Sequence, residues 1–472
     1  MPPLFYHVSA RPPIRTTKTK YHSLVIFLSI IVFLAGCHPS ITTQTAPQAE
    51  NTDSLENNIQ PTPSQTHQVP ATQTPDPIIS HSPTPHPSPT PRKLQVEQVE
   101  ESDHSPLLLA HYMPWYQTPE FHNYWSWHWT MNHFDPDQKG ENGRRSIASH
   151  YYPLTGPYDS SDPDLLEYQV MLMRVSGIDG VIIDWYGIEN FWDYGTIHQS
   201  TKELVQHIEE AGLLFAICYE SQTVMHMVEN GHLARESAHS HGQEVMKFLE
   251  EHWFPKDSYL KVDGQPVLFN FGNPPPLLVT QDMRLKPIAD SSYPWPPMGQ
   301  VGTGELPQTR LQYFLNSFYN RASRWDYQVA SAFPGFHDIY AEAGVQESHG
   351  YLDPKGGETF QYTLQRAMDS QPEVIQLVTW NDYGEGTNLE PTKEYGYQYL
   401  KMIQVLKRNQ IDPNFPYQEN DLGLPFENYR LRKQYSGESE INMRLDQAVK
   451  AVLSGKPEIA DSILTDLRQQ EK

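Results

Sequence analysis

The segment Gly180-Val181-Ile182-Ile183-Asp184-Trp185 decides the fold class, because its first four residues offer no polar face. A strand that is apolar on both sides is typical of a parallel sheet covered by helices on each face. Similar runs lie at 107–112, 213–219, 266–271, 328–333 and 374–380. Helical patterns separate several of these runs, at 164–176, 201–211 and 238–252.

This alternation of strands and helices predicts an α/β fold, a (β/α)8 TIM barrel over residues 104–420. Six strands are well marked, whereas the fifth and sixth have only candidates near 277–279 and 287–290. A doubly wound open sheet is the alternative, but no glycine-rich phosphate loop opens a helix.

Residues 438–470 predict a short C-terminal helical hairpin, with a turn at Gly455-Lys456-Pro457. The hairpin resembles one tetratricopeptide unit, and such a unit cannot bury its apolar face alone. We therefore expect it to pack on the barrel rather than to recruit a partner.

Polar and aromatic residues follow almost every predicted strand. The carboxyl ends of barrel strands meet on one face, so we expect these residues to form one site, although strand capping would explain some of them. The candidates for substrate binding are Tyr112, Trp115, Asp184, Trp185, Glu220, Asn270, His337, Asp338, Trp380 and Asn381. Asp184 either orients substrate hydroxyls or pairs with a neighbour.

Two acids, Asp382 and Glu385, follow the last strand in the segment Trp380-Asn381-Asp382-Tyr383-Gly384-Glu385-Gly386-Thr387. Glycosidic bonds are cleaved by two carboxyl groups, one of which donates a proton while the other acts as nucleophile or base. Two acids in one cleft have their pKa values pushed apart, as such a pair requires. Acids at this spacing are also common on solvated loops, so spacing alone leaves both interpretations open.

Longer motifs carry a resemblance to a known family. Residues 380–391 and 395–400, the opening Tyr112-Met113-Pro114-Trp115-Tyr116 and residues 259–267 together resemble the glycoside hydrolase family 71/99-like group. Family 99 enzymes are retaining endo-α-mannosidases with a (β/α)8 barrel. The resemblance therefore implies an endo-acting glycosidase that cleaves α-mannan or a related α-linked polysaccharide.

The resemblance also implies roles for individual residues. Glu385 would be the general acid/base, and Asp382 would deprotonate the sugar 2-hydroxyl for an epoxide-like intermediate. Glu220 matches a glutamate that contacts the reacting sugar, and Tyr112 a tyrosine that lines the same subsite. The family usually has Glu at the position of Asp382 and Trp at that of Tyr383, so the shorter aspartate departs from its pattern. The motif is also similar to WbsX-type domains of polysaccharide biosynthesis.

The N-terminal sequence predicts a targeting segment. Basic residues precede an apolar stretch at 24–34, which ends in Leu34-Ala35-Gly36-Cys37. This resembles a bacterial lipobox, which implies a signal peptide over residues 1–37, cleavage before Cys37 and lipid on its sulfur. An uncleaved N-terminal anchor is the alternative. Both the cleaved signal peptide and the uncleaved anchor would place the barrel outside the cytoplasm. Residues 38–103 are rich in Pro, Thr and Ser and predict a disordered tether.

Composition limits the partners. The net charge of -23 argues against nucleic acid. Two cysteines, Cys37 and Cys218, exclude a disulfide framework, and Cys218 is interpreted as a buried apolar residue. No histidine spacing resembles a metal site, so we expect no metal or cofactor. We also expect the protein to be a monomer. The aromatic segment 124–129 predicts either a polysaccharide platform or inward strand packing.

Three functions are compatible with these patterns: a lipid-anchored glycoside hydrolase, a non-catalytic glycan-binding lipoprotein, or a glycosyltransferase. The presence of both acids disfavours the non-catalytic glycan-binding lipoprotein. An extracytoplasmic location disfavours the glycosyltransferase, because nucleotide-sugar donors are cytoplasmic.

Overall fold

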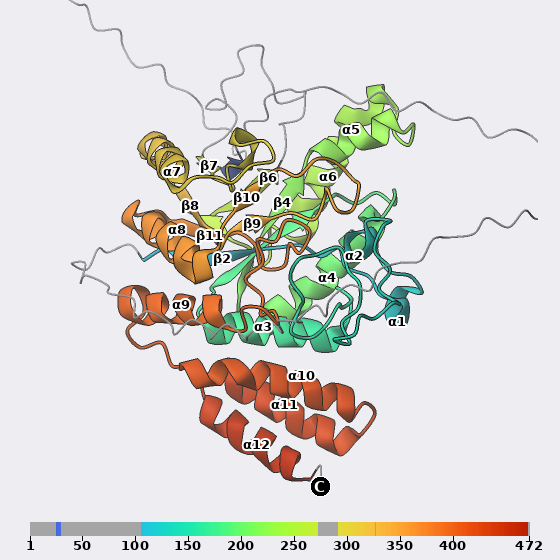
Figure 1. Ribbon diagram of the computed structural model, residues 1–472, viewed down its shortest axis with the longest axis vertical. Helices are drawn as coiled ribbons and strands as arrows, with labels where there is room; N and C mark the ends of the chain where they lie inside the picture. Colours follow the sequence, from blue (N-terminus) through green and yellow to red (C-terminus); the bar gives the residue numbers. More distant parts are fainter. Residues whose placement is uncertain (1–24, 30–104, 272–290, 326, 471–472) are drawn as a thin grey trace, which may run out of the picture. The chain divides into compact units, whose positions relative to one another are not determined.

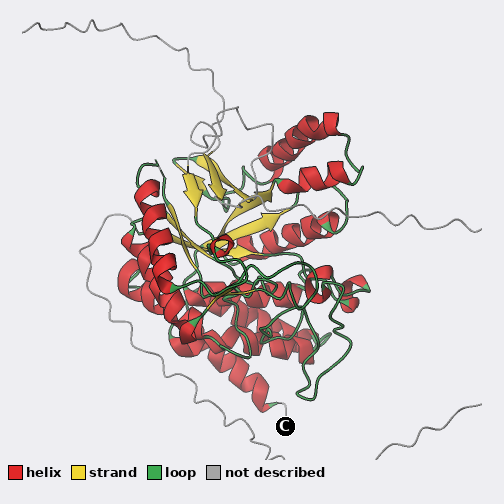
Figure 2. Ribbon diagram, turned by 45° about the horizontal axis from the view of Figure 1, so that its top comes forward, coloured by secondary structure: helices red, strands yellow, loops and turns green. Residues whose placement is uncertain are grey.

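The computed structural model describes residues 25–29, 105–271, 291–325 and 327–470. Helices surround a central sheet in these regions (Figures 1 and 2). Among the helices in the described part of the chain, none is both long and apolar enough to cross a bilayer.

Within the described residues, eight parallel strands form the central sheet, in the order β7-β1-β6-β4-β3-β2-β11-β8. The six strands predicted from their apolar runs are β2 (Leu107–Tyr112), β3 (Gly180–Trp185), β4 (Leu214–Glu220), β6 (Gln265–Phe271), β8 (Val329–Ala332) and β11 (Val374–Leu377). Every ladder along this path is parallel. The (β/α)8 barrel predicted from the sequence is thereby confirmed.

The fifth and sixth strand positions differ from the sequence-based candidates. β7 (Ser291–Tyr293) occupies the sixth position, directly after the candidate at 287–290, and both candidates lie outside the described residues. The fifth position is held by β1 (Val25–Ser29), which pairs with β6 and β7. This segment belongs to the predicted signal peptide, so its removal would take β1 out of the mature protein.

Helices cover the outside of the sheet, as expected for buried parallel strands. They are α3 (Pro163–Ser176), α4 (Tyr194–Glu210), α5 (Gln222–Glu229), α6 (Ala238–His252), α7 (Gln308–Ala322), α8 (Glu358–Asp369) and α9 (Gln398–Leu406). α3 begins as its sequence predicts: the Asp162 side chain accepts a hydrogen bond from the Asp164 amide at 3.0 Å, and Pro163 occupies the first turn.

Short elements complete the loops. They are α1 (Pro119–His122), α2 (Trp127–Thr130), β5 (Lys261–Val262), β9 (Phe336–His337), β10 (Tyr351–Leu352), the 3-10 turns Arg235–Ser237, Met298–Gln300, Lys355–Gly357 and Glu419–Gly423, and the π turn Lys407–Ile411. β5 pairs antiparallel with β6, and β9 pairs antiparallel with β10.

The C-terminal hairpin consists of α11 (Ser439–Leu453) and α12 (Pro457–Gln469), and α10 (Leu424–Gln434) precedes it (Figure 1). Arg432 of α10 donates two hydrogen bonds to the Glu167 carboxylate of α3, at 2.7 and 2.9 Å. Lys433 pairs with Asp162 at 2.8 Å. These contacts join α10 to the barrel, and α11 of the hairpin also contacts α3, as expected for a hairpin that packs on the barrel.

Candidate active site

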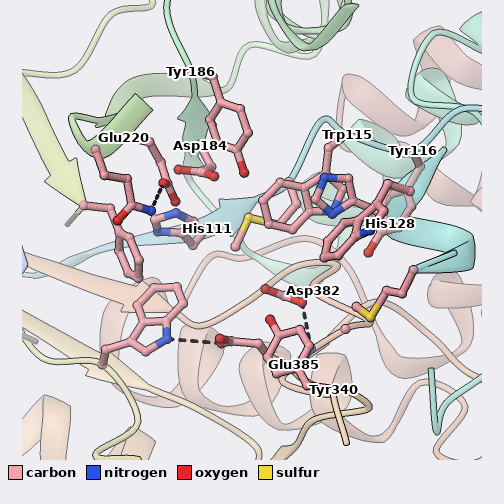
Figure 3. Close-up of a pocket in the computed structure, with 17 residues that line it drawn as sticks. His111, Trp115, Tyr116, His128, Asp184, Tyr186, Glu220, Tyr340, Asp382 and Glu385 are labelled. Carbon is pink, nitrogen blue, oxygen red and sulfur yellow. Dashed lines mark hydrogen bonds between the residues drawn. The ribbon is translucent and has the colours of Figure 1, made fainter. Parts of the chain in front are cut away.

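A pocket of about 240 Å³ opens at the carboxyl ends of the barrel strands (Figure 3). Four acids line it: Asp184 near the end of β3, Glu220 at the end of β4, and Asp382 and Glu385 in the loop after β11. In Figure 3, Asp184 and Glu220 lie on one side of the pocket, and Asp382 and Glu385 on the other. This is the face on which barrel enzymes carry their active sites.

The loop that carries Asp382 and Glu385 is fixed by its own hydrogen bonds. The Glu385 amide donates to Asp382 Oδ1 at 2.9 Å, and the Asp382 amide donates to Thr379 Oγ1 at 2.8 Å. Gly386 has φ +65, and a Cβ there would lie 2.6 Å from the His337 carbonyl oxygen. The turn therefore requires glycine at this position.

Beneath this loop, the carboxylate of Glu390 joins three elements. It accepts hydrogen bonds from Tyr158 Oη at 2.8 Å, Tyr383 Oη at 2.9 Å and Gln169 Nε2 at 2.6 Å. All four side chains are buried. The network ties the loop after β11 to α3 and to the segment between α2 and α3, which holds the two catalytic candidates in place.

Burial and mutual repulsion raise the pKa values of the acids in the pocket. Burial raises the pKa of Asp382 to about 6, although backbone amides and His128 oppose the shift. Burial, and then the charge of Asp382, raise the pKa of Glu385 well above its usual range. Burial also raises the pKa of Glu220 to about 7. Asp382 is thus the group that ionises more readily, and Glu385 the one that keeps its proton.

One oxygen of Glu385 is held by an aromatic side chain. Trp295 Nε1 donates to Glu385 Oε2 at 3.3 Å (Figure 3). The edge of Trp295 in turn meets His111, with ring centroids 5.1 Å apart, and burial lowers the pKa of His111 to about 3. A donor on Oε2 leaves Oε1 as the oxygen that carries the proton.

Aromatic side chains form the rest of the wall. Trp115 stacks on His128 with ring centroids 4.2 Å apart, and Trp127, which is 40% exposed, lies at the rim. The segment 124–129 contains a short helix rather than the expected strand: Trp127 lines the pocket, whereas Trp129 is buried and donates to the Tyr158 carbonyl oxygen at 2.8 Å. The polysaccharide platform stays a prediction. Flat apolar faces beside carboxylates suit a carbohydrate.

The chain is similar to several known proteins, although no family model matches it. It is 24% identical over 338 residues to a glycoprotein endo-α-1,2-mannosidase-like protein of Danio rerio. This match covers 63% of this chain and 75% of the relative. It is 22% identical over 350 residues to the glycoprotein endo-α-1,2-mannosidase of Rattus norvegicus, covering 64% and 71%. The structure of the GH99 endo-α-mannosidase from Bacteroides thetaiotaomicron matches with a TM-score of 0.45 at 16% identity, covering 65% of this chain and 98% of that one.

The chain is similar in sequence to glycoprotein endo-α-1,2-mannosidases. The resemblance predicted from the motifs is thereby confirmed.

Five of the predicted site residues line the pocket: Trp115, Asp184, Glu220, Asp382 and Glu385. They come from four strand ends that are far apart in sequence. The roles assigned to them by resemblance stay predictions.

Tyr112 and Trp185 point away from the pocket, which corrects the expectation that they bind substrate. Tyr112 Oη donates to Gln169 Oε1 on α3 at 2.6 Å. Trp185 packs against Trp253, with centroids 5.0 Å apart, and donates to His198. Successive side chains of a strand point to opposite faces, so the inward residues are their neighbours His111 and Asp184.

The other five predicted residues are not among those that line the pocket, which differs from the expectation. Asn381 accepts from the Met113 amide at 2.8 Å, and Trp380 is buried. Asp338 accepts from the His349 amide at 2.7 Å, while His337 stacks on His150 at 3.6 Å. Asn270 donates to Ser221 Oγ. These polar groups cap strand ends and shape loops, the competing explanation that the sequence left open.

Several pocket residues were not predicted from the sequence. They are His111, Met113, Tyr116, Met131, Tyr186, Gln222, Phe271, Trp295, Tyr340 and Gly384. Trp127 and His128 also line the pocket and belong to the predicted aromatic segment 124–129. Strand phase would have found some of them, because a pocket-facing Asp184 places Tyr186 on the same side. Trp295 and Tyr340 lie in loops, where the sequence carried no such signal.

Proposed function

We propose that the chain is a lipid-anchored, endo-acting glycoside hydrolase that cleaves an α-linked polysaccharide, α-mannan or a related glycan, with retention. The observation that supports this most directly is the pairing of Asp382 and Glu385 in one buried loop at the pocket, where their pKa values are raised to different extents. The similarity to proteins named as endo-α-1,2-mannosidases supports the choice of sugar linkage.

In the proposed reaction, Glu385 Oε1 donates its proton to the glycosidic oxygen as the bond to the anomeric carbon breaks. The carboxylate of Asp382 takes the proton of the sugar 2-hydroxyl, and the 2-oxygen attacks the anomeric carbon to close an epoxide. Glu385, now ionised, removes a proton from water, which opens the epoxide at the anomeric carbon. Asp382 returns its proton to the 2-oxygen. The two inversions give net retention.

Glu220 is placed to hold the reacting sugar from the opposite side. It lies at the end of β4 and accepts a hydrogen bond from Gln222, which also lines the pocket. The shorter side chain of Asp382 sets its carboxylate back from the position that a glutamate would reach. We propose that the backbone of the loop, held by the Thr379 hydroxyl, compensates for this difference.

Hydrolysis is tested by incubating the protein with a panel of α-mannans and α-glucans and measuring reducing ends. We expect release by the parent protein, and a loss of about 10²–10⁴-fold in kcat for Glu385→Gln, the range for removal of a general acid. Glu229→Gln, on the exposed surface of α5, is the matched control and should keep full activity. NMR of the first product should show the α-anomer.

The same panel separates the competing functions. Binding without release of reducing ends would reject hydrolysis in favour of a glycan-binding lipoprotein. Elongation of an acceptor glycan with a sugar donor would indicate a transferase.

The lipid anchor is a second part of the proposal and rests on Leu34-Ala35-Gly36-Cys37. Mass spectrometry of the protein from bacterial membranes should find an N-terminal Cys37 carrying acyl chains. Cys37→Ser should move the protein out of the membrane fraction. A mature protein that retains residues 1–36 would reject cleavage.

A further inference from the structure

Three side chains that the proposed reaction does not use gather beside the pocket, and two of them line it. His111 of β2, Asp184 of β3 and Cys218 of β4 lie on adjacent parallel strands. The register pairs Asp184 with Cys218, and it pairs His111 with Ile182. Ile182 lies two residues before Asp184 and so points to the same face of β3, which places His111, Asp184 and Cys218 on one face of the sheet. One nitrogen, one carboxylate oxygen and the sulfur lie within 4.8 Å of one another.

Their burial makes this grouping unusual. The exposed fractions are 1% for His111, 2% for Asp184 and 0% for Cys218. Both ring nitrogens of His111 and both carboxylate oxygens of Asp184 have no hydrogen-bond partner of normal geometry among the described residues. Gln376 approaches the histidine, but its amide atoms also make no such bond. Burial of polar groups without hydrogen-bond partners is unfavourable, so a ligand that satisfied them would stabilise the fold.

We propose that His111, Asp184 and Cys218 bind a divalent transition-metal ion of the zinc class. Imidazole, thiolate and carboxylate are the ligands that Zn²⁺ takes in proteins. A thiolate disfavours Mg²⁺ and Ca²⁺, which prefer oxygen. A divalent ion with one thiolate, one carboxylate and one neutral imidazole forms a site without net charge, which suits a buried position.

The geometry leaves one coordination position toward the pocket. His111 and Asp184 line the pocket, whereas Cys218 lies behind its wall. Ligand atoms on one tetrahedral zinc ion lie about 3.3–3.8 Å apart, so small side-chain rotations would close the present spacing. The fourth position then faces the space in which a sugar hydroxyl or a water molecule would sit. Binding of the ion does not depend on the hydrolase proposal.

Cobalt binding provides a direct test, because a cobalt–thiolate bond has an intense charge-transfer band in the near ultraviolet. The full chain carrying Cys37→Ser keeps Cys218 as its only thiol. After removal of metals with a chelator, titration with Co²⁺ should develop this band with saturation at one ion per chain. Addition of Zn²⁺ should abolish it. Absence of the band would overturn the proposal, because no other thiol could provide it.

Variants in the same background identify the ligands. Cys218→Ser should remove the band and weaken Zn²⁺ binding at least tenfold, and His111→Asn should weaken binding similarly. His133→Asn, at an exposed histidine outside the pocket, is the matched control and should bind like the parent. Equal loss in the control, or a band that survives Cys218→Ser, would reject the site. Circular dichroism checks folding, and the parent spectrum remains decisive if a variant unfolds.

Hydrolysis of α-mannan is measured separately on the same samples. A protein that binds Co²⁺ through Cys218 but releases no reducing ends would retain the metal site and reject the hydrolase. A protein that releases reducing ends but shows no cobalt–thiolate band would retain the hydrolase and reject the metal site.

Discussion

At the scale of single residues, the two acids of the catalytic loop differ in their surroundings rather than in their chemistry. Asp382 accepts a backbone amide within its own turn, whereas Glu385 faces an indole and the charge of Asp382. This difference supports the proposed roles, in which Asp382 is the base and Glu385 the acid. It also predicts how activity depends on pH.

We expect a bell-shaped dependence of kcat/KM on pH. Activity should rise through pH about 6 as Asp382 loses its proton and becomes able to accept one. It should fall at higher pH as Glu385, whose pKa is raised further, loses the proton that it must donate. Initial rates on α-mannan across the pH range check this. A profile that falls steadily from pH 4 would contradict the assignment of the two acids.

Glu390 offers a prediction about positioning. In Glu390→Gln, one carboxylate oxygen becomes an NH2 group that cannot accept from the Gln169 amide. We expect the free energy of unfolding to fall by about 1–3 kcal/mol, and kcat to fall because the loop shifts. Urea denaturation and initial rates measure the two effects.

The exchange double variant Glu390→Gln with Gln169→Glu is the matching control. Here the carboxylate introduced at position 169 accepts from the new amide and still accepts from Tyr112 Oη, while the amide oxygen introduced at position 390 faces Tyr158 and Tyr383. Most of the lost stability should return. If the double variant is no better than the single one, the hydrogen-bond explanation is wrong.

At the scale of elements, short helix α2 divides its aromatic residues between core and pocket. Trp129 is buried, whereas Trp127 is partly exposed and lines the rim. A tryptophan held at a rim offers a flat face to a sugar ring before the bond reaches the acids. We therefore expect this helix to contribute to glycan binding rather than to chemistry.

Trp127→Ala should raise KM about fivefold, since loss of one aromatic stacking contact costs on the order of 1 kcal/mol. It should leave kcat nearly unchanged. Trp192→Ala is the matched control, because Trp192 is 63% exposed and does not line the pocket. Equal effects in the two variants would argue that Trp127 has no specific part in binding.

At the scale of the whole molecule, α10 joins the C-terminal helices to the barrel through Arg432 and Glu167. Arg432→Ala removes this partly buried pair and should lower the free energy of unfolding by about 2 kcal/mol. Arg444→Ala breaks only an exposed pair with Asp466 and should cost less than about 0.5 kcal/mol. Denaturant unfolding measures both, and a larger effect of Arg444→Ala would contradict the assignment.

The sequence by itself determined the barrel, its six marked strands and the loop with Asp382 and Glu385. Runs that are apolar on both faces fit few environments, and a glycine-rich turn with two acids after a buried strand must lie at the carboxyl end of the sheet. These are local properties, which a chain carries in its residue order.

Only the tertiary structure decided which side chains enter the pocket. Apolar runs have no period-two pattern, so nothing in them separated His111 from Tyr112, or Asp184 from Trp185. The register of adjacent strands makes that choice. It also brings His111, Asp184 and Cys218 together from positions spread over more than a hundred residues, a grouping that no spacing in the sequence could reveal.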